Sequence, residues 1–230
     1  MAYSKIKAFN SKFKENEKKG LVICGLQFGT DRDKKPHKIA NLLDDYKGKK
    51  HCFSNFVNYP SKDDFAFQKR ITKFFGLWDC CLETDFDKVG AFERSLMGIN
   101  WLSNGADSMD NENYHSFFQA EHKESFFHHL EVLEPKLLFF FGIDMLRALN
   151  DERIKPYAEN FLGKAKNEPN YITKPFEGKS FRVGFQSFEK CEVVAFPHPT
   201  GTIGLSDEYI ALFKDEIKPL IENYRKSKGV

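Results

Sequence analysis

The sequence lacks several features that would narrow its class at once. No apolar run approaches the roughly 18–20 residues that a membrane-spanning helix needs, and the first residues show no signal-peptide pattern. The formal net charge is only +2 at pH 7, which excludes a strongly polycationic protein. We therefore expect a soluble, cytoplasmic chain without a membrane partner.

Cysteine is scarce and is not spaced as in a metal site. The five cysteines include no C-x-x-C pair, so neither a zinc site nor an iron–sulfur cluster is supported. We expect reduced, mostly buried thiols. Four histidines fall in one stretch, namely His115, His122, His128 and His129. Because adjacent histidines on a helix point apart, we expect surface positions, and neither a metal nor another cofactor.

Phosphate-binding signatures and internal repeats are also missing. No Walker lysine follows the glycine-bracketed turn at residues 25–29, and its spacing is not G-x-G-x-x-G. An NTPase or a dinucleotide enzyme is therefore poorly supported. With 230 residues, of which 41% are hydrophobic, and no evident linker, one domain over residues 1–230 is expected.

Four short apolar runs are typical of strands that are covered on both faces. They lie at residues 21–26, 93–102, 135–142 and 192–196. Helical spacing predicts intervening helices at about residues 3–18, 61–75, 113–133 and 206–226. This order predicts an α/β fold, a three-layer α/β/α sandwich around a central, mainly parallel four-stranded sheet. Residues 31–51 form a predicted inserted loop, residues 150–180 an irregular segment, and residues 180–185 a candidate edge strand.

The carboxyl ends of parallel strands form one rim, where open α/β sheets bind ligands. Asn100 is among the last residues of one predicted strand and His198 follows another, and both should converge there with Gln27. An asparagine amide presents a donor beside an acceptor, which suits the edge of a nucleobase, and Phe28 or Phe53 would stack on the base. The simpler alternatives are an Asn100 side chain bonded to a neighbouring loop and a His198 that only caps a turn.

The order of the motifs resembles that of the uracil-DNA glycosylase superfamily. The first turn, Gly25-Leu-Gln-Phe-Gly29, matches the family turn of the type Gly-Gln-Asp-Pro-Tyr. Ile99-Asn100-Trp101 matches the strand that ends in a base-reading asparagine, and residues 133–142 match the Pro-Lys-hydrophobic-Gly strand. His198-Pro-Thr-Gly201 matches the closing His-Pro-Ser-Pro motif. The resemblance covers roughly residues 20–226.

The resemblance implies hydrolysis of the N-glycosidic bond of a flipped base in DNA. It assigns water placement to Gln27, base reading to Asn100, stacking to Phe53 or Phe28, and charge stabilisation to His198. Thr200, Gly201 and Thr202 would contact DNA, and Ile203 would enter the vacated stack. The family often has Asp or Asn where Gln27 stands, and Gln27 cannot act as a general base. Asp31 or Asp33 is therefore a candidate for a displaced carboxylate.

The substrate and the activity stay open at this point. Uracil is the family default, whereas the altered turn and the insertion favour a bulkier pyrimidine, such as hydroxymethylated or glucosylated cytosine, as in anti-phage defence glycosylases. The alternatives are a noncatalytic member that binds DNA or a partner protein, and a small-molecule hydrolase of the same fold. We expect a monomer that acts in DNA repair or in antiviral defence.

Overall fold

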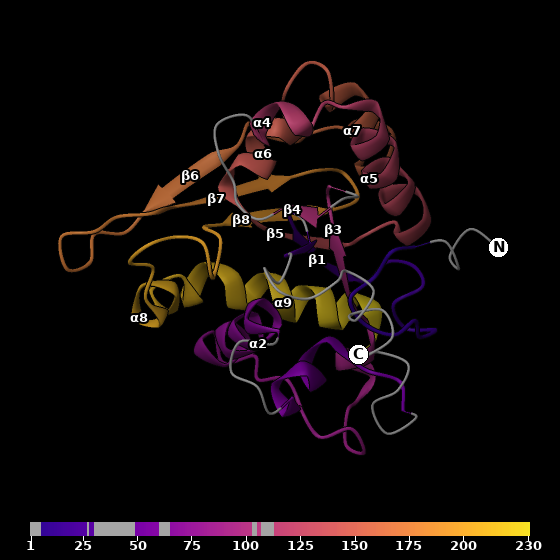
Figure 1. Ribbon diagram of the computed structural model, residues 1–230, viewed down its shortest axis with the longest axis vertical. Coiled ribbons are helices and arrows are strands. Elements are labelled where there is room, and N and C mark those ends of the chain that lie inside the picture. Colours follow the sequence, from indigo (N-terminus) through magenta and orange to yellow (C-terminus); the bar gives the residue numbers. More distant parts are fainter. Residues whose placement is uncertain (1–5, 27, 30–48, 60–64, 103–104, 107–112) are drawn as a thin grey trace.

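A six-stranded sheet forms the centre of the molecule. The computed structural model describes residues 6–26, 28–29, 49–59, 65–102, 105–106 and 113–230. The strand order is β3-β1-β5-β8-β7-β6 (Figure 1). The bounds are β1 (Leu21–Gly25), β3 (Leu96–Asn100), β5 (Leu137–Phe141), β6 (Asn170–Thr173), β7 (Arg182–Ser187) and β8 (Glu192–Phe196). The first four strands of this order run parallel, and β7 runs antiparallel to both of its neighbours, β8 and β6.

The predicted α/β fold with a mainly parallel central sheet is confirmed, but the sheet has six strands rather than the four predicted. The strand expected at residues 180–185 is β7, which lies inside the sheet between β8 and β6. The segment 150–180, predicted to be irregular, contains α7 (Lys155–Leu162) and β6. Three of the four residues of β6 are exposed. A strand with so little buried surface has no apolar run by which to recognise it.

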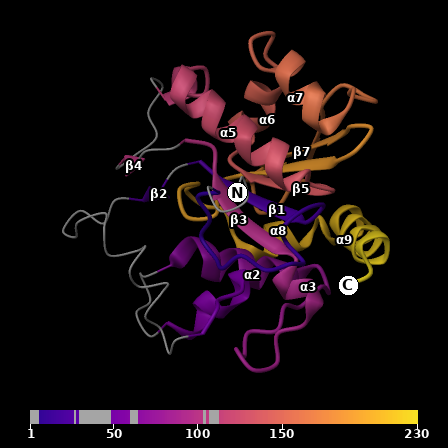
Figure 2. The ribbon, with the colours of Figure 1, turned by 90° about the vertical axis from the view of Figure 1, so that its right-hand side faces the viewer.

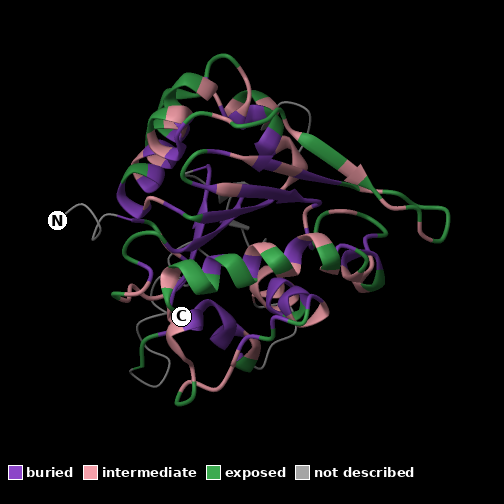
Figure 3. Ribbon diagram, turned by 180° about the vertical axis from the view of Figure 1, so that it is seen from behind, coloured by how far each residue is buried: buried purple, intermediate pink, exposed green. Residues whose placement is uncertain are grey.

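Helices cover both faces of the sheet (Figures 1 and 3). One core contains Phe140 and packs under α5 (Ala120–Leu133), α6 (Ile143–Leu149) and α7. The other core contains Phe139 and Phe141 and packs under α2 (Ala66–Leu77) and α9 (Lys214–Lys228). Alternate residues of one strand enter opposite cores because successive side chains of a strand point to opposite faces.

Shorter elements complete the described chain. They are η2 (Phe53–Asn58), α3 (Ala91–Arg94), α4 (Asn113–Ser116), α8 (Asp207–Ala211), β2 (Phe28–Gly29) and β4 (Gly105–Ala106). β2 and β4 form a separate parallel pair beside the main sheet (Figure 2). The helix predicted at residues 113–133 is thus two helices, and the closing helix is divided into α8 and α9. Among the described helices, none is long and apolar enough to cross a membrane.

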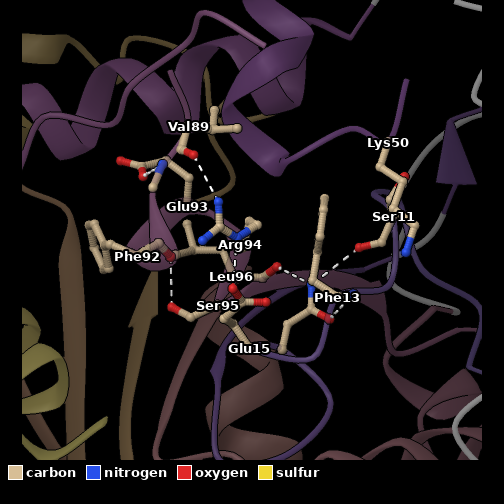
Figure 4. Close-up of polar contacts among 12 residues, drawn as sticks. Ser11, Phe13, Glu15, Lys50, Val89, Phe92, Glu93, Arg94, Ser95 and Leu96 are labelled. Carbon is tan, nitrogen blue, oxygen red and sulfur yellow. Dashed lines mark hydrogen bonds and ion pairs between the residues drawn. The ribbon is translucent and has the colours of Figure 1, made fainter. Parts of the chain in front are cut away.

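The predicted helix at residues 3–18 is wrong for the part that is described, which has no helix over residues 6–20. This segment instead lies along the edge strand β3. Asn10 accepts a hydrogen bond from the Gly98 N–H (2.8 Å) and donates one to the Leu96 carbonyl (3.0 Å), to which Asn16 also donates (3.0 Å). Asparagine side chains that bond to backbone groups compete with helix formation. Arg94 binds this segment through Glu15 (2.7 Å), and it also donates to the nearby Val89 carbonyl (3.0 Å) (Figure 4).

Candidate nucleic-acid site at the carboxyl rim

The candidate site lies where the direction of chain connection reverses across the sheet. β1 has β3 on one side and β5 on the other, so the chain turns to opposite sides after successive strands. Ligands of open α/β sheets bind outside the carboxyl ends of the strands at such a point. Gly25 ends β1 there and is the register partner of Asn100, the last residue of β3.

Asn100 is a buried amide without a hydrogen-bond partner in the described part of the chain. Its residue is 3% exposed, and neither its Oδ1 nor its Nδ2 atom is bonded to a described residue. An unpaired buried polar group costs about 1–3 kcal/mol. Native structures contain few such groups, and each needs an explanation. An amide that is held ready for the edge of a ligand provides one.

Gly25 creates the space beside this amide. A methyl group placed on Gly25 would lie 2.6 Å from Oδ1 of Asn100 and 3.2 Å from Cζ of Phe67. Real Cβ contacts are longer than 3.0 Å, so any larger residue would displace the amide. Glycine is therefore required here because of the close approach of a side chain.

Phe67 joins the two halves of the site, and the sequence analysis did not identify it. Its ring, from the first turn of α2, lies with its centroid 5.6 Å from that of His198 and 5.8 Å from that of Phe141. Since its Cζ also approaches Gly25, which packs against Asn100, both Asn100 and His198 lie near one phenylalanine at the same rim. The available signal was position, because Phe67 begins the apolar stripe that continues at Ile71 and Phe74.

His198 follows β8 and is half-buried. Its Nδ1 atom accepts a hydrogen bond from the Gly201 N–H (2.9 Å), so in the neutral ring the proton is on Nε2. Burial lowers the pKa of His198 below its usual value. The site therefore holds a neutral imidazole with one N–H donor that the turn does not use.

Arg70 fixes the loop that carries His198, and it too was missed. Its guanidinium donates to the carbonyl of Pro199 and to that of Leu205 (2.5 Å), at the two ends of the loop. It also contacts the Asp207 carboxylate (3.3 Å), which Lys73 approaches as well (2.5 Å). A planar guanidinium that donates in several directions is suited to hold a loop in one conformation.

The four predicted DNA-contacting residues lie on this loop. Thr200, Gly201 and Ile203 are exposed and Thr202 is half-buried. Ile203 is 97% exposed, an unusual position for a large apolar side chain. Gly204 follows with a φ of +80°, which favours glycine. The loop therefore presents one isoleucine to solvent on a firmly held backbone.

Other predicted site residues lie elsewhere or beyond the described residues. Phe53 is fully buried against Gly98, two residues before Asn100 on the same face of β3. The backbone of Phe28 pairs with Gly105, and its side chain is outside the described part. Gln27 and Asp31 lie outside the described residues, as do Asp33 and most of the insertion at residues 31–51.

The surface position predicted for the histidines is wrong for two of them. His122 is 1% and His129 is 3% exposed, and burial lowers the pKa of His129 to about 4. Within the described ranges, no group of three or more His, Cys, Asp or Glu side chains is placed to hold a metal. The five cysteines are free, and only Cys81 is exposed.

Comparison with known proteins gives no family assignment. The sequence matches no protein-family model and no curated protein.

Proposed function

We propose that this chain is a DNA glycosylase that hydrolyses the N-glycosidic bond of an extruded pyrimidine and leaves an abasic site. The observation that carries the proposal is the buried Asn100 amide, which has neither its donor nor its acceptor satisfied among the described residues. A pyrimidine edge offers the complementary donor and acceptor pair. Phe67 lies close both to Gly25, beside this amide, and to the His198 ring. The motif order that resembles the uracil-DNA glycosylase superfamily supports the same reaction.

The chemistry requires stabilisation of charge more than a strong base. The glycosidic bond breaks through an oxocarbenium-like sugar, and the base leaves as an anion. A neutral imidazole that donates from Nε2 to an oxygen of the base stabilises that anion, as donors aimed at developing charge do. Asn100 holds the base, Phe67 packs against it, and a water that Gln27 orients attacks the sugar carbon. The lowered pKa of His198 keeps the ring in the required neutral form.

In this proposal the loop at residues 200–203 binds the DNA. Thr200, Gly201 and Thr202 contact a phosphate through hydroxyl and backbone N–H groups, which positions the duplex without reading its sequence. Ile203, which is 97% exposed, enters the stack that the extruded nucleotide vacates. Because Ile203 is already exposed on a firmly held loop, its insertion into the stack costs little folding energy.

The test is a panel of duplexes that carry uracil, hydroxymethylcytosine or glucosylated cytosine, incubated with the protein and then cleaved at abasic sites by alkali. We expect strand breakage with wild type, none with His198→Ala, and wild-type breakage with His115→Ala, because His115 is an exposed histidine on α4. Free base detected by mass spectrometry would identify the substrate. Tight binding without an abasic product across the panel would instead support the noncatalytic DNA-binding alternative.

A further inference from the structure

The hairpin of β6 and β7 projects from the sheet beside the loop that carries His198 (Figures 1 and 3). Tyr209 of α8 is only 1% exposed and attaches the hairpin to α8, the helix that follows this loop. Its hydroxyl donates to the Phe181 carbonyl and accepts from the N–H groups of Phe181 (2.9 Å) and Lys174 (3.3 Å). Because α8 directly follows the loop, the hairpin has a fixed position relative to Ile203.

The turn of the hairpin places an ammonium group against this loop. Nζ of Lys179 would lie 2.5 Å from a methyl group placed on Gly204, the residue after Ile203. Lys179 is also held through its backbone, which exchanges two hydrogen bonds with Phe176 (2.9 and 3.0 Å). The position of this cation is therefore set both by the turn and by the glycine on which it packs.

Lys179 differs from the other lysine of the same turn. Lys174 forms an ion pair with Glu216 (2.6 Å), which neutralises it. No carboxylate of the described residues lies within ion-pair distance of Lys179, which is exposed. An unneutralised cation beside an exposed isoleucine is the combination that an opened DNA stack requires, since an apolar side chain enters the stack and the flanking phosphates carry the charge.

We propose that the β6–β7 hairpin is a second DNA-contacting arm, in which Lys179 binds a backbone phosphate next to the extruded nucleotide. This inference rests on the proposed function, because it names how the same rim grips its DNA. The arm extends the contact from the loop at residues 200–203 to the outer end of the sheet. Sequence-independent phosphate binding of this kind adds affinity and fixes the register of the duplex.

The probe is a duplex with one tetrahydrofuran abasic site. The enzyme should bind this probe regardless of which base it excises. Binding is measured by fluorescence anisotropy over a range of salt. For Lys179→Ala we expect the affinity at about 0.1 M salt to fall roughly fivefold to tenfold, and the slope of log K against log salt to decrease by about 0.9. Lys179→Arg should restore both. Lys190→Ala is the matched control, because Lys190 is exposed beside Lys19 and Lys136 at the amino ends of the parallel strands, opposite the carboxyl rim.

Neutral methylphosphonates at single positions of the duplex locate the contact. We expect one position within about two nucleotides of the abasic site to weaken wild-type binding and to leave Lys179→Ala binding unchanged. Equal losses in both proteins at every position, or equal affinities of Lys179→Ala and Lys190→Ala, would overturn the arm while leaving the proposed function intact. Absence of wild-type binding to any DNA would overturn both.

Discussion

Asparagine side chains lie in two regions next to the edge strand β3, and the two regions differ in whether these side chains are hydrogen-bonded. Along its outer edge, Asn10 and Asn16 bond to the backbone of Leu96 and Gly98. At its carboxyl end, Asn100 is equally buried, but both polar atoms lack a partner among the described residues. The first pair completes the sheet through side-chain hydrogen bonds, whereas the side chain of Asn100 makes no hydrogen bond to it.

Under the proposed function, this difference separates structural from functional polar groups. Burial of an amide is favourable only when its donor and acceptor are satisfied. Asn10 replaces the hydrogen bonds that a neighbouring strand would make. Under the proposed function, Asn100 meets the same requirement when the base is bound, and the free protein carries the cost of an unpaired buried amide. The following predictions test whether the two regions differ in this way.

The largest effect is expected at Asn100. In Asn100→Ala the rate of base release on the substrate identified by the panel should fall about 10²–10³-fold, as when a donor to a developing anion is lost. The melting temperature should not decrease, because no hydrogen bond to a described residue is removed. Single-turnover kinetics and thermal unfolding measure the two quantities. A lowered melting temperature with unchanged kinetics would make Asn100 structural.

Asn10→Ala should show the reverse behaviour. It leaves the Gly98 N–H unsatisfied at a buried edge and removes one of the two hydrogen bonds to the Leu96 carbonyl, so we expect the free energy of unfolding to decrease by about 2–4 kcal/mol. The rate per folded molecule should remain unchanged. Urea unfolding measures the loss, and Asn223→Ala is the control, because Asn223 is exposed on α9. A kinetic defect in folded Asn10→Ala would erase the distinction between the two regions.

Arg70→Ala should have the smallest effect, a decrease of about tenfold in the rate of base release. The variant keeps the His198 side chain but releases the loop that positions it. Burial lowers the pKa of His198, so wild-type activity should stay constant as the pH falls through the usual value of about 6.5 and decline only below it. In the variant, greater exposure of the ring should move this decline to higher pH.

The pH profile distinguishes positioning by Arg70 from a simple loss of stability. Lys73→Ala is the control, since Lys73 also contacts Asp207 but donates to neither loop carbonyl. Its profile should follow that of wild type. Arg70→Lys should recover only part of the rate, because an ammonium cannot reproduce the planar fork that reaches both carbonyls. An Arg70→Ala profile identical to that of wild type would argue against the positioning role.

The sequence was sufficient to predict the parallel core but not its borders. Runs such as residues 137–141 are apolar throughout because they are covered on both faces, and this pattern is local. Ile6, Phe9 and Phe13 have helical spacing, but the backbone of β3 determines the conformation of that segment through Asn10 and Asn16. These partners are more than 75 residues away, at separations of 86 and 80.

The sequence predicted only those site residues that lie at the end of a strand or just after it. Asn100 ends β3 and His198 lies two residues after the end of β8, so their meeting at one rim follows from the parallel topology. Arg70 acts on the carbonyls of Pro199 and Leu205, 129 and 135 residues away, and backbone carbonyls have no sequence signature. Phe67 resembles any other member of the apolar stripe of α2. Its place beside Asn100 depends on where α2 packs.

The segment at residues 8–16, which covers the outer edge of β3, also affects how the protein behaves in concentrated solution. Edge strands with unpaired backbone groups promote pairing between molecules and aggregation. Ala8 forms an antiparallel bridge with Ile99, and Phe9 donates to the Gly98 carbonyl (2.7 Å), so residues 8–16 block this edge. A truncation that removes them would expose a buried, apolar strand to its neighbours. Expression variants intended for crystallisation or binding assays should therefore keep this segment.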